Sequence, residues 1–159
     1  MNPGSRIKQT LSNQTMNKKL WLQIAAGLAF FMAGCQIVIS LSPAAAAYFQ
    51  APPSLLVDRL KLFIIGEAAA VILLIIGLYG LSGAGNIRRL PLLRPGLIVI
   101  STLFLLRGSF ILITLLKLFG VLEGETPAQG VISHLVFLAA GITYALGTVL
   151  NWKEMKAGR

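Results

Sequence analysis

Four apolar segments, each long enough to cross a lipid bilayer, constrain the fold of this chain more than any other feature. A transmembrane helix needs about 20 consecutive apolar residues, and in lipid its backbone polar groups must be satisfied within the helix itself. The sequence therefore predicts an all-α, polytopic membrane protein with four transmembrane helices. The segments are Leu20 to Leu41, Leu60 to Gly80, Gly96 to Phe119 and Gly130 to Asn151.

Composition excludes an ordinary soluble domain. Of the 159 residues, 56% are hydrophobic and only 12% are charged, whereas soluble domains carry roughly 25% charged residues. The connections between the segments are short, which favours an antiparallel, up-down-up-down bundle. We expect a disordered arm at residues 1–17, a four-helix transmembrane domain at 18–153 and a short tail at 154–159.

The basic residues are distributed unequally between the two sides of the predicted bundle. Ten of the fourteen Lys and Arg residues lie before the first segment, in the second loop or after the fourth segment, which by the positive-inside rule places both termini in the cytoplasm. This distribution explains the net charge of +9 better than nucleic-acid binding does. The residues expected to face lipid headgroups are Lys18, Lys19, Arg88, Arg89, Arg94 and Lys153, and the aromatic anchors expected at the interfaces are Trp21, Tyr48, Tyr79 and Trp152.

The first segment imitates a bacterial lipoprotein signal. The stretch "MNKKLWLQIAAGLAFFMAGC" places basic residues before an apolar run that reaches a box ending in Cys35. The run continues to Leu41, however, giving about 22 residues where a signal has 7 to 15. We therefore predict a retained helix in a bacterial inner membrane, with processing at Cys35 as the alternative. A single cysteine excludes an intramolecular disulfide.

Turn chemistry lies where the four helices require connections. We expect a short interfacial helix at residues 44–49 and a helix start at residues 52–54. Glycines of "LSGAGN" should end the second helix, and Pro95 should open the third. Thr126 and Pro127 should cap and open the fourth.

One arginine, Arg107, lies almost at the centre of the third segment, where a charge costs about 2.5 to 3.5 kcal/mol or more. The other three segments each offer a polar residue in the outer half of the bundle: Gln36, Glu67 and His134. Small residues share their helical faces, which are therefore the expected packing faces. We predict a buried Glu67–Arg107 ion pair bordered by Gln36 and His134. This pair could fix helix register only, or mark a ligand site; alternatively, Arg107 extends to lipid without Glu67.

Motifs for catalysis are scarce. "GLSGAG" follows a helix and lacks the lysine of a phosphate-binding loop. No metal-ligand spacing is present, and one histidine cannot supply both axial ligands of a haem within one chain. We predict no catalytic residues and no metal site.

The stretch "GEAAAVILLIIGLYGLSG" (66–83) resembles the second helix of the DoxX-like family of small bacterial membrane proteins, and "GLAFFMAGCQIVIS" (27–40) is similar to its first helix. The resemblance implies a four-helix bundle and an accessory role in membrane oxidoreductase complexes, in some cases near quinone. Of the family's residues only Glu67 carries over. Family members commonly have a basic residue near the end of the first helix. This chain has none there, in the segment from Gln36 to Ser40.

Three functions stay open from the sequence. The chain could be an accessory or scaffold subunit bound to another membrane protein, a solute or proton pathway formed by copies of itself, or a redox partner that binds quinone beside Arg107 and His134.

Overall fold

The computed structural model describes residues 3–49, 51–121, 123 and 128–156, and in this part of the chain every regular element is a helix. Four helices are long and apolar enough to cross a membrane, which confirms the predicted spans: Lys18–Leu41, Arg59–Ala84, Leu93–Lys117 and Ala128–Lys153. The helices in full are α1 (Pro3–Leu41), α2 (Pro43–Tyr48), α3 (Pro53–Val57), α4 (Arg59–Ala84), α5 (Leu93–Leu118) and α6 (Ala128–Lys156).

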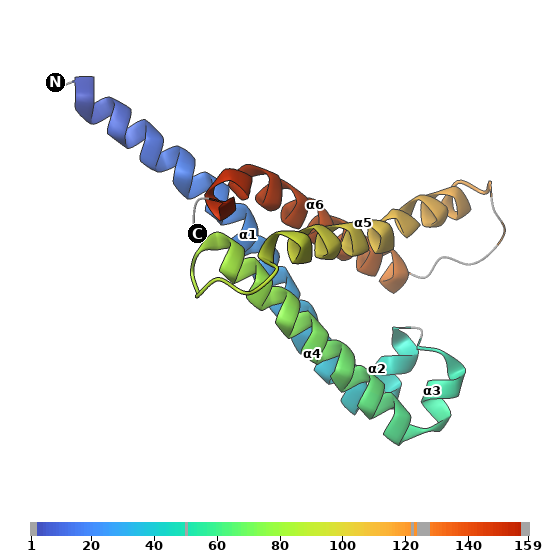
Figure 1. The fold of residues 1–159 in the computed structure, drawn as a ribbon. Coiled ribbons are helices and arrows are strands. Elements are labelled where there is room, and N and C mark those ends of the chain that lie inside the picture. The colour runs from blue at the N-terminus through green and yellow to red at the C-terminus, as the bar shows by residue number, and fades with distance from the viewer. Residues whose placement is uncertain (1–2, 50, 122, 124–127, 157–159) are drawn as a thin grey trace.

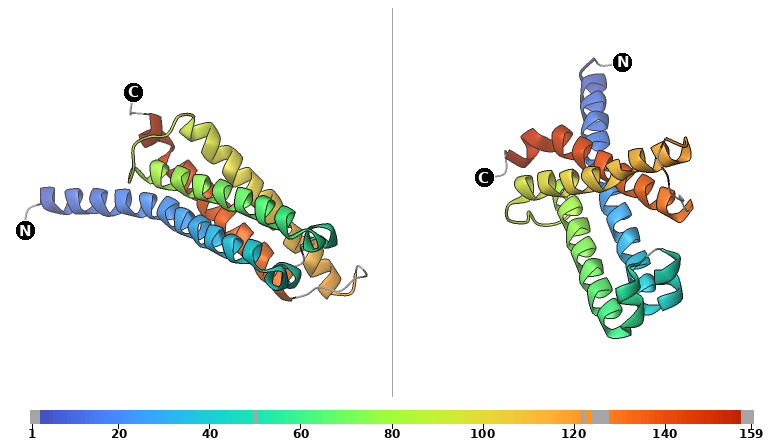
Figure 2. Two further views of the ribbon diagram at one scale, coloured as in Figure 1. Left: turned by 90° about the horizontal axis from the view of Figure 1, so that it is seen from below. Right: turned by 90° about the vertical axis from the view of Figure 1, so that its right-hand side faces the viewer.

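The four long helices form two pairs. Helix α1 lies along α4, and α5 lies along α6, while contacts between α1 and α6 join the pairs. Figure 1 shows the pairs meeting near the α4–α5 connection and diverging toward their other ends, and the right-hand view of Figure 2 shows them crossing. The predicted single bundle is therefore split over much of its length.

The hydrophobic core lies where the pairs cross, and it is built from all four long helices. Polar bonds join the helices at the same place. The Tyr144 hydroxyl, fully buried, donates to the carbonyl of Ile76 at 2.9 Å, and Asn151 Nδ2 donates to the carbonyl of Lys18 at 2.8 Å. The core residues are Leu22, Ala25, Met32, Ala84, Leu93, Leu97, Ile100, Phe104, Ala140 and Tyr144.

Helix α1 extends well beyond the first span at its beginning. It starts at Pro3 and runs on without a break into the first span. A helix already nucleated by an apolar span extends at little cost, because propagation adds one hydrogen bond for each residue fixed.

The connections follow the predicted turn chemistry in part. The expected interfacial helix is α2, capped by the Ser42 side chain, and Asp58 caps α4. Helix α4 ends at Gly85, whose φ of 78° is the left-handed conformation that glycine adopts without strain. Pro95 lies within the first turn of α5, since this helix begins at Leu93. The expected cap at Thr126 and Pro127 falls outside the described residues.

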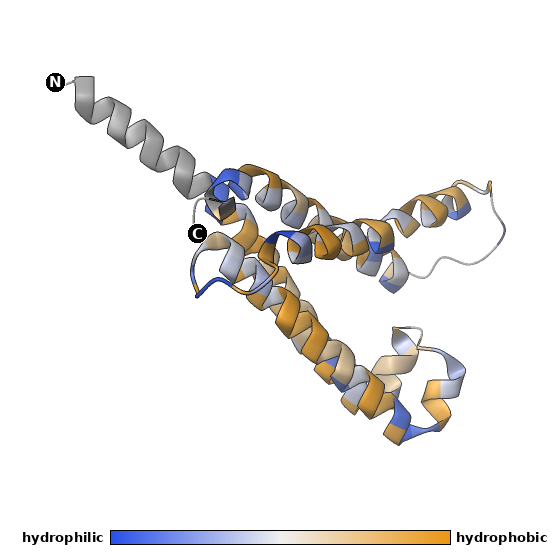
Figure 3. Cartoon of the chain, in the orientation of Figure 1, coloured by the Kyte–Doolittle hydropathy of each residue, from blue (hydrophilic) through white to orange (hydrophobic). Residues whose placement is uncertain are grey.

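The exposed surface is apolar along the spans, and exposed charged residues lie at the α4–α5 connection. Figure 3 shows hydrophobic residues along the long helices and hydrophilic ones at the α4–α5 connection. Of the predicted anchors, Trp21, Tyr48 and Trp152 are exposed and Tyr79 is half-buried. A surface of this kind suits contact with lipid tails, as four membrane-spanning helices require.

Candidate functional site: an arginine and a histidine on α5 and α6

Close packing of α5 on α6 brings Arg107 and His134 together. A Cβ added at Gly108 would lie 2.6 Å from the Cα atom of Leu138, so only glycine permits this approach of the two helices. Arg107, the residue before Gly108, is exposed, and its Nη1 lies 3.1 Å from His134 Nδ1. Small residues at helix interfaces in membranes allow such close contacts.

The protonation state of the histidine follows from this contact. A guanidinium has five N–H donors and no acceptor, so His134 Nδ1 must be the acceptor and its ring proton must be on Nε2. A neutral imidazole leaves the positive charge of Arg107 uncompensated. The remaining N–H groups of the guanidinium are available to another acceptor.

Two aromatic rings border the cation. Arg107 Cζ lies 5.4 Å from the ring centroid of Phe137 and 5.8 Å from that of Phe110. The Phe110 ring also stacks on the His134 ring, with 6.2 Å between centroids and 27° between planes. The electron-rich ring faces stabilise the charge, but each such contact is worth only about 0.5 to 2 kcal/mol.

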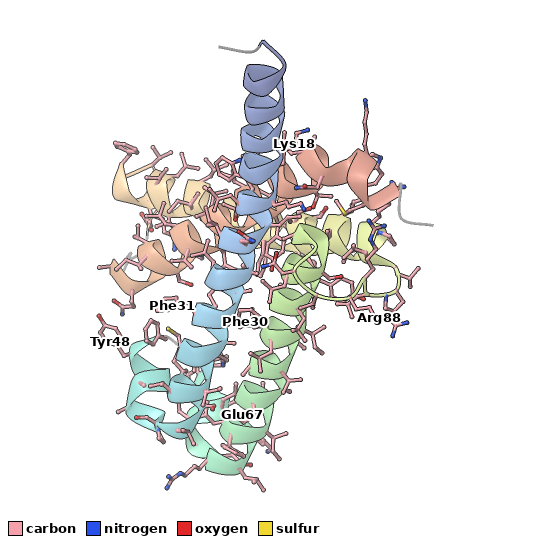
Figure 4. All side chains as sticks on the ribbon, turned by 90° about the vertical axis from the view of Figure 1, so that its left-hand side faces the viewer. Lys18, Phe30, Phe31, Tyr48, Glu67 and Arg88 are labelled. Carbon is pink, nitrogen blue, oxygen red and sulfur yellow. The ribbon has the colours of Figure 1, made fainter. Side chains whose placement is uncertain are left out.

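Glu67 lies in the other helical pair, and the described residues show no Glu67–Arg107 ion pair. The Ser40 hydroxyl of α1 donates to Glu67 Oε1 at 2.5 Å. Figure 4 places Glu67 on α4 toward the end that is far from Lys18, where the pairs have diverged. Among the described residues the ion pair is Lys61–Asp58, at 3.1 Å. Matching depths along helices do not determine which helices are neighbours at that depth.

The predicted cluster of four polar residues is therefore divided between the two pairs. Arg107 and His134 lie together on α5 and α6. Gln36 is half-buried on α1, four residues before Ser40, in the pair that carries Glu67. Arg107 and His134 are hydrogen-bonded to each other, whereas no contact among the described residues joins Gln36 or Glu67 to them.

Three residues of these sites were not predicted: Ser40 as the partner of Glu67, and Phe110 and Phe137 beside Arg107. The signal for the phenylalanines is present in the sequence, since each follows Arg107 or His134 by three residues and so shares its helical face. Ser40 follows Gln36 by four residues and so shares its helical face in the first segment.

The basic residues predicted at the membrane surface gather at the crossing end of the pairs. Arg94 Nη2 donates to the carbonyl of Trp152 at 2.8 Å, and Arg89 Nη1 donates to that of Met155 at 3.4 Å. Together with the bond from Asn151 to Lys18, these contacts join the α4–α5 connection and the start of α5 to the end of α6, and the end of α6 to α1 at Lys18. We call this part of the molecule the basic end.

Within the described residues, no three His, Cys, Asp or Glu side chains come close enough to hold a metal ion, and Cys35 is exposed. No family model matches the chain, and comparisons with curated proteins and with solved structures found no match.

Proposed function

We propose that this protein is a small accessory subunit of a bacterial inner-membrane complex, and that it docks onto a partner transmembrane helix through Arg107 and His134. In this proposal the four helices cross the membrane up-down-up-down with the basic end in the cytoplasm. The asymmetry of Lys and Arg supports that orientation, and the four apolar helices support the location.

The exposed charge of Arg107 carries the proposal. Its guanidinium lies near the middle of α5, hydrogen-bonded to a neutral histidine and without a carboxylate among the described residues. About 11 residues separate Arg107 from the end of α5, which corresponds to about 16 Å at 1.5 Å per residue. An arginine extends part of that distance only. A carboxylate on a neighbouring helix would neutralise the charge within the membrane.

The test is purification of the tagged protein from its native membrane in a mild detergent. We expect a stoichiometric partner with an acidic residue in a transmembrane helix. Arg107→Gln should release this partner and Arg107→Lys should retain part of it, because lysine keeps the charge but not the planar set of donors. Lys117→Gln removes a charge from the end of the same helix and should retain the partner fully. A partner that withstands Arg107→Gln would refute the docking mode.

A second candidate, quinone binding, is favoured by the chemistry around Arg107. The guanidinium and His134 Nε2 are donors suited to quinone carbonyls, and Phe110 and Phe137 offer ring faces for a planar headgroup. The residues present therefore fit a quinone, which would supply electron transfer when bound. Organic extraction of gently purified protein tests this: quinone should be recovered from the natural protein and lost in Phe137→Ala.

A solute or proton pathway built by copies of the chain has less support, because Glu67 and Arg107 make separate contacts in different helical pairs. The relationship to the DoxX-like family belongs to the proposal as well. It rests on the resemblance of the first two spans, in which Glu67 is the residue that carries over.

A further inference from the structure

An open groove of about 440 Å³ lies between α5 and α6 at the basic end. The residues that line it include Ile98, Ala145 and Val149, and also Trp152 and Lys153 toward the C-terminal end of α6, which we call its mouth. The two hydroxyls in the walls, on Ser101 and Thr148, donate to carbonyls of their own helices at 2.9 and 2.7 Å. The groove therefore presents an almost wholly apolar lining, with polarity confined to one end.

One cation, Lys153, lines this mouth, and a second, Arg94, contacts its Trp152. Lys153 is exposed, and Arg94 lies over the ring of Trp152, with 4.7 Å from Cζ to the ring centroid. The Nε atom of Arg94 is buried and has no hydrogen-bond partner among the described residues. A buried donor of this kind costs about 1 to 3 kcal/mol unless an acceptor reaches it. The groove thus combines an apolar channel with cationic groups at its end.

The position along the spans fits the same chemistry. The candidate span on α6 ends at Lys153, and that on α5 begins at Leu93, so the mouth lies at the level of one membrane interface. Tryptophan is enriched at that level because its ring is apolar while its N–H is polar. An occupant of the groove would have its tail among acyl chains and its head in the headgroup region.

We propose that this groove binds one anionic phospholipid, with an acyl chain along Ile98, Ala145 and Val149 and the phosphate between Lys153 and Arg94. The apolar walls favour a lipid over a free phosphate ion, and the charge at the mouth favours an anionic headgroup over a zwitterionic one. The site is independent of Arg107 and of the partner proposed for it.

Native mass spectrometry of the delipidated full-length protein tests the proposal, after incubation with phosphatidylglycerol, phosphatidylcholine or inorganic phosphate. We expect retention of one phosphatidylglycerol and no retention of the other two. Lys153→Gln should weaken this binding about fivefold, the equivalent of about 1 kcal/mol for one cation near the membrane surface. Arg88→Gln removes an equal charge from an exposed position at the same end and should have little effect.

A second variant tests the channel itself. Ala145→Phe fills the groove and should abolish retention, whereas Ala139→Phe places the same side chain on an exposed face of the same helix and should not. Circular dichroism would establish that each variant is folded. Equal losses in Lys153→Gln and Arg88→Gln would show that the net charge attracts lipid without a site. Full retention in folded Ala145→Phe, or equal retention of phosphatidylcholine, would also overturn the proposal.

Discussion

The hydroxyl of Ser40, at the end of α1, donates to Glu67 Oε1 of α4 at 2.5 Å. Ser40 is buried, with 2% of its surface exposed, and it can also donate to the carbonyl of Ile37, at 2.8 Å. The contact forms beside Gly66, where a Cβ would collide with Cβ of Ser40. The carboxyl group in the second span is thus stabilised by a hydroxyl of the first, without a cation.

Replacing Ser40 should cost more than replacing Glu67. Ser40→Ala removes the donor to a half-buried carboxylate and should lower the free energy of unfolding by about 1 to 2 kcal/mol. Glu67→Ala leaves the hydroxyl its bond to Ile37 and should cost less. Unfolding in mixed micelles measures both. Ser109→Ala is the control, because that exposed hydroxyl bonds only within its own helix; equal effects at the two serines would contradict the prediction.

Gly66 should tolerate no side chain. Gly66→Ala pushes α1 away from α4 at Ser40, and overpacking of this kind typically costs about 1 to 3 kcal/mol. A Cβ at Gly34 meets nothing within 4 Å, so Gly34→Ala is a matched control on the facing helix and should be neutral. The measurement is the thermal midpoint of the detergent-solubilised protein. A similar midpoint for both variants would show that α1 and α4 are not in close contact at Gly66.

Double-mutant cycles should distinguish the two polar sites. Glu67 and Arg107 share no partner, so the effects of Glu67→Ala and Arg107→Ala on unfolding free energy should add within about 0.5 kcal/mol. Arg107→Ala and His134→Ala should show coupling above that value, because these two residues are hydrogen-bonded. Strong coupling between Glu67 and Arg107 would instead indicate that these two side chains interact directly.

The start of α4 should depend on pH through Asp58. The backbone N–H and side chain of Lys61 bind the carboxylate and hold the pKa of Asp58 below its ordinary value of 3.8. Because the pKa of Asp58 is lower in the folded state, the cap contributes its full stabilisation above about pH 3.8. This stabilisation is lost as the pH falls through the pKa of the folded state. The protection factors of the Leu60 and Lys61 amides against hydrogen exchange should fall there, and Asp58→Asn should remove this pH dependence.

The sequence determined the four long helices of this protein. An apolar stretch of about 20 residues that crosses a bilayer must satisfy its backbone hydrogen bonds internally, and a helix does so. Local capping residues made the short helix α2 and the glycine cap of α4 predictable in the same way. The polar residues of the spans were recognisable too, since each is costly in lipid. The helical faces that carry Arg107 and His134 also carry small residues, which marks them as packing faces.

Only the tertiary structure decided which polar residues meet. In lipid, all four helices offer similar apolar surfaces, so hydrophobicity does not select neighbours, and close packing at glycines such as Gly66 and Gly108 does. Those contacts join α1 to α4 and α5 to α6, which separates Glu67 from Arg107. Depth along a helix is a property of the sequence, whereas the lateral arrangement of helices depends on side-chain packing between residues far apart in the chain.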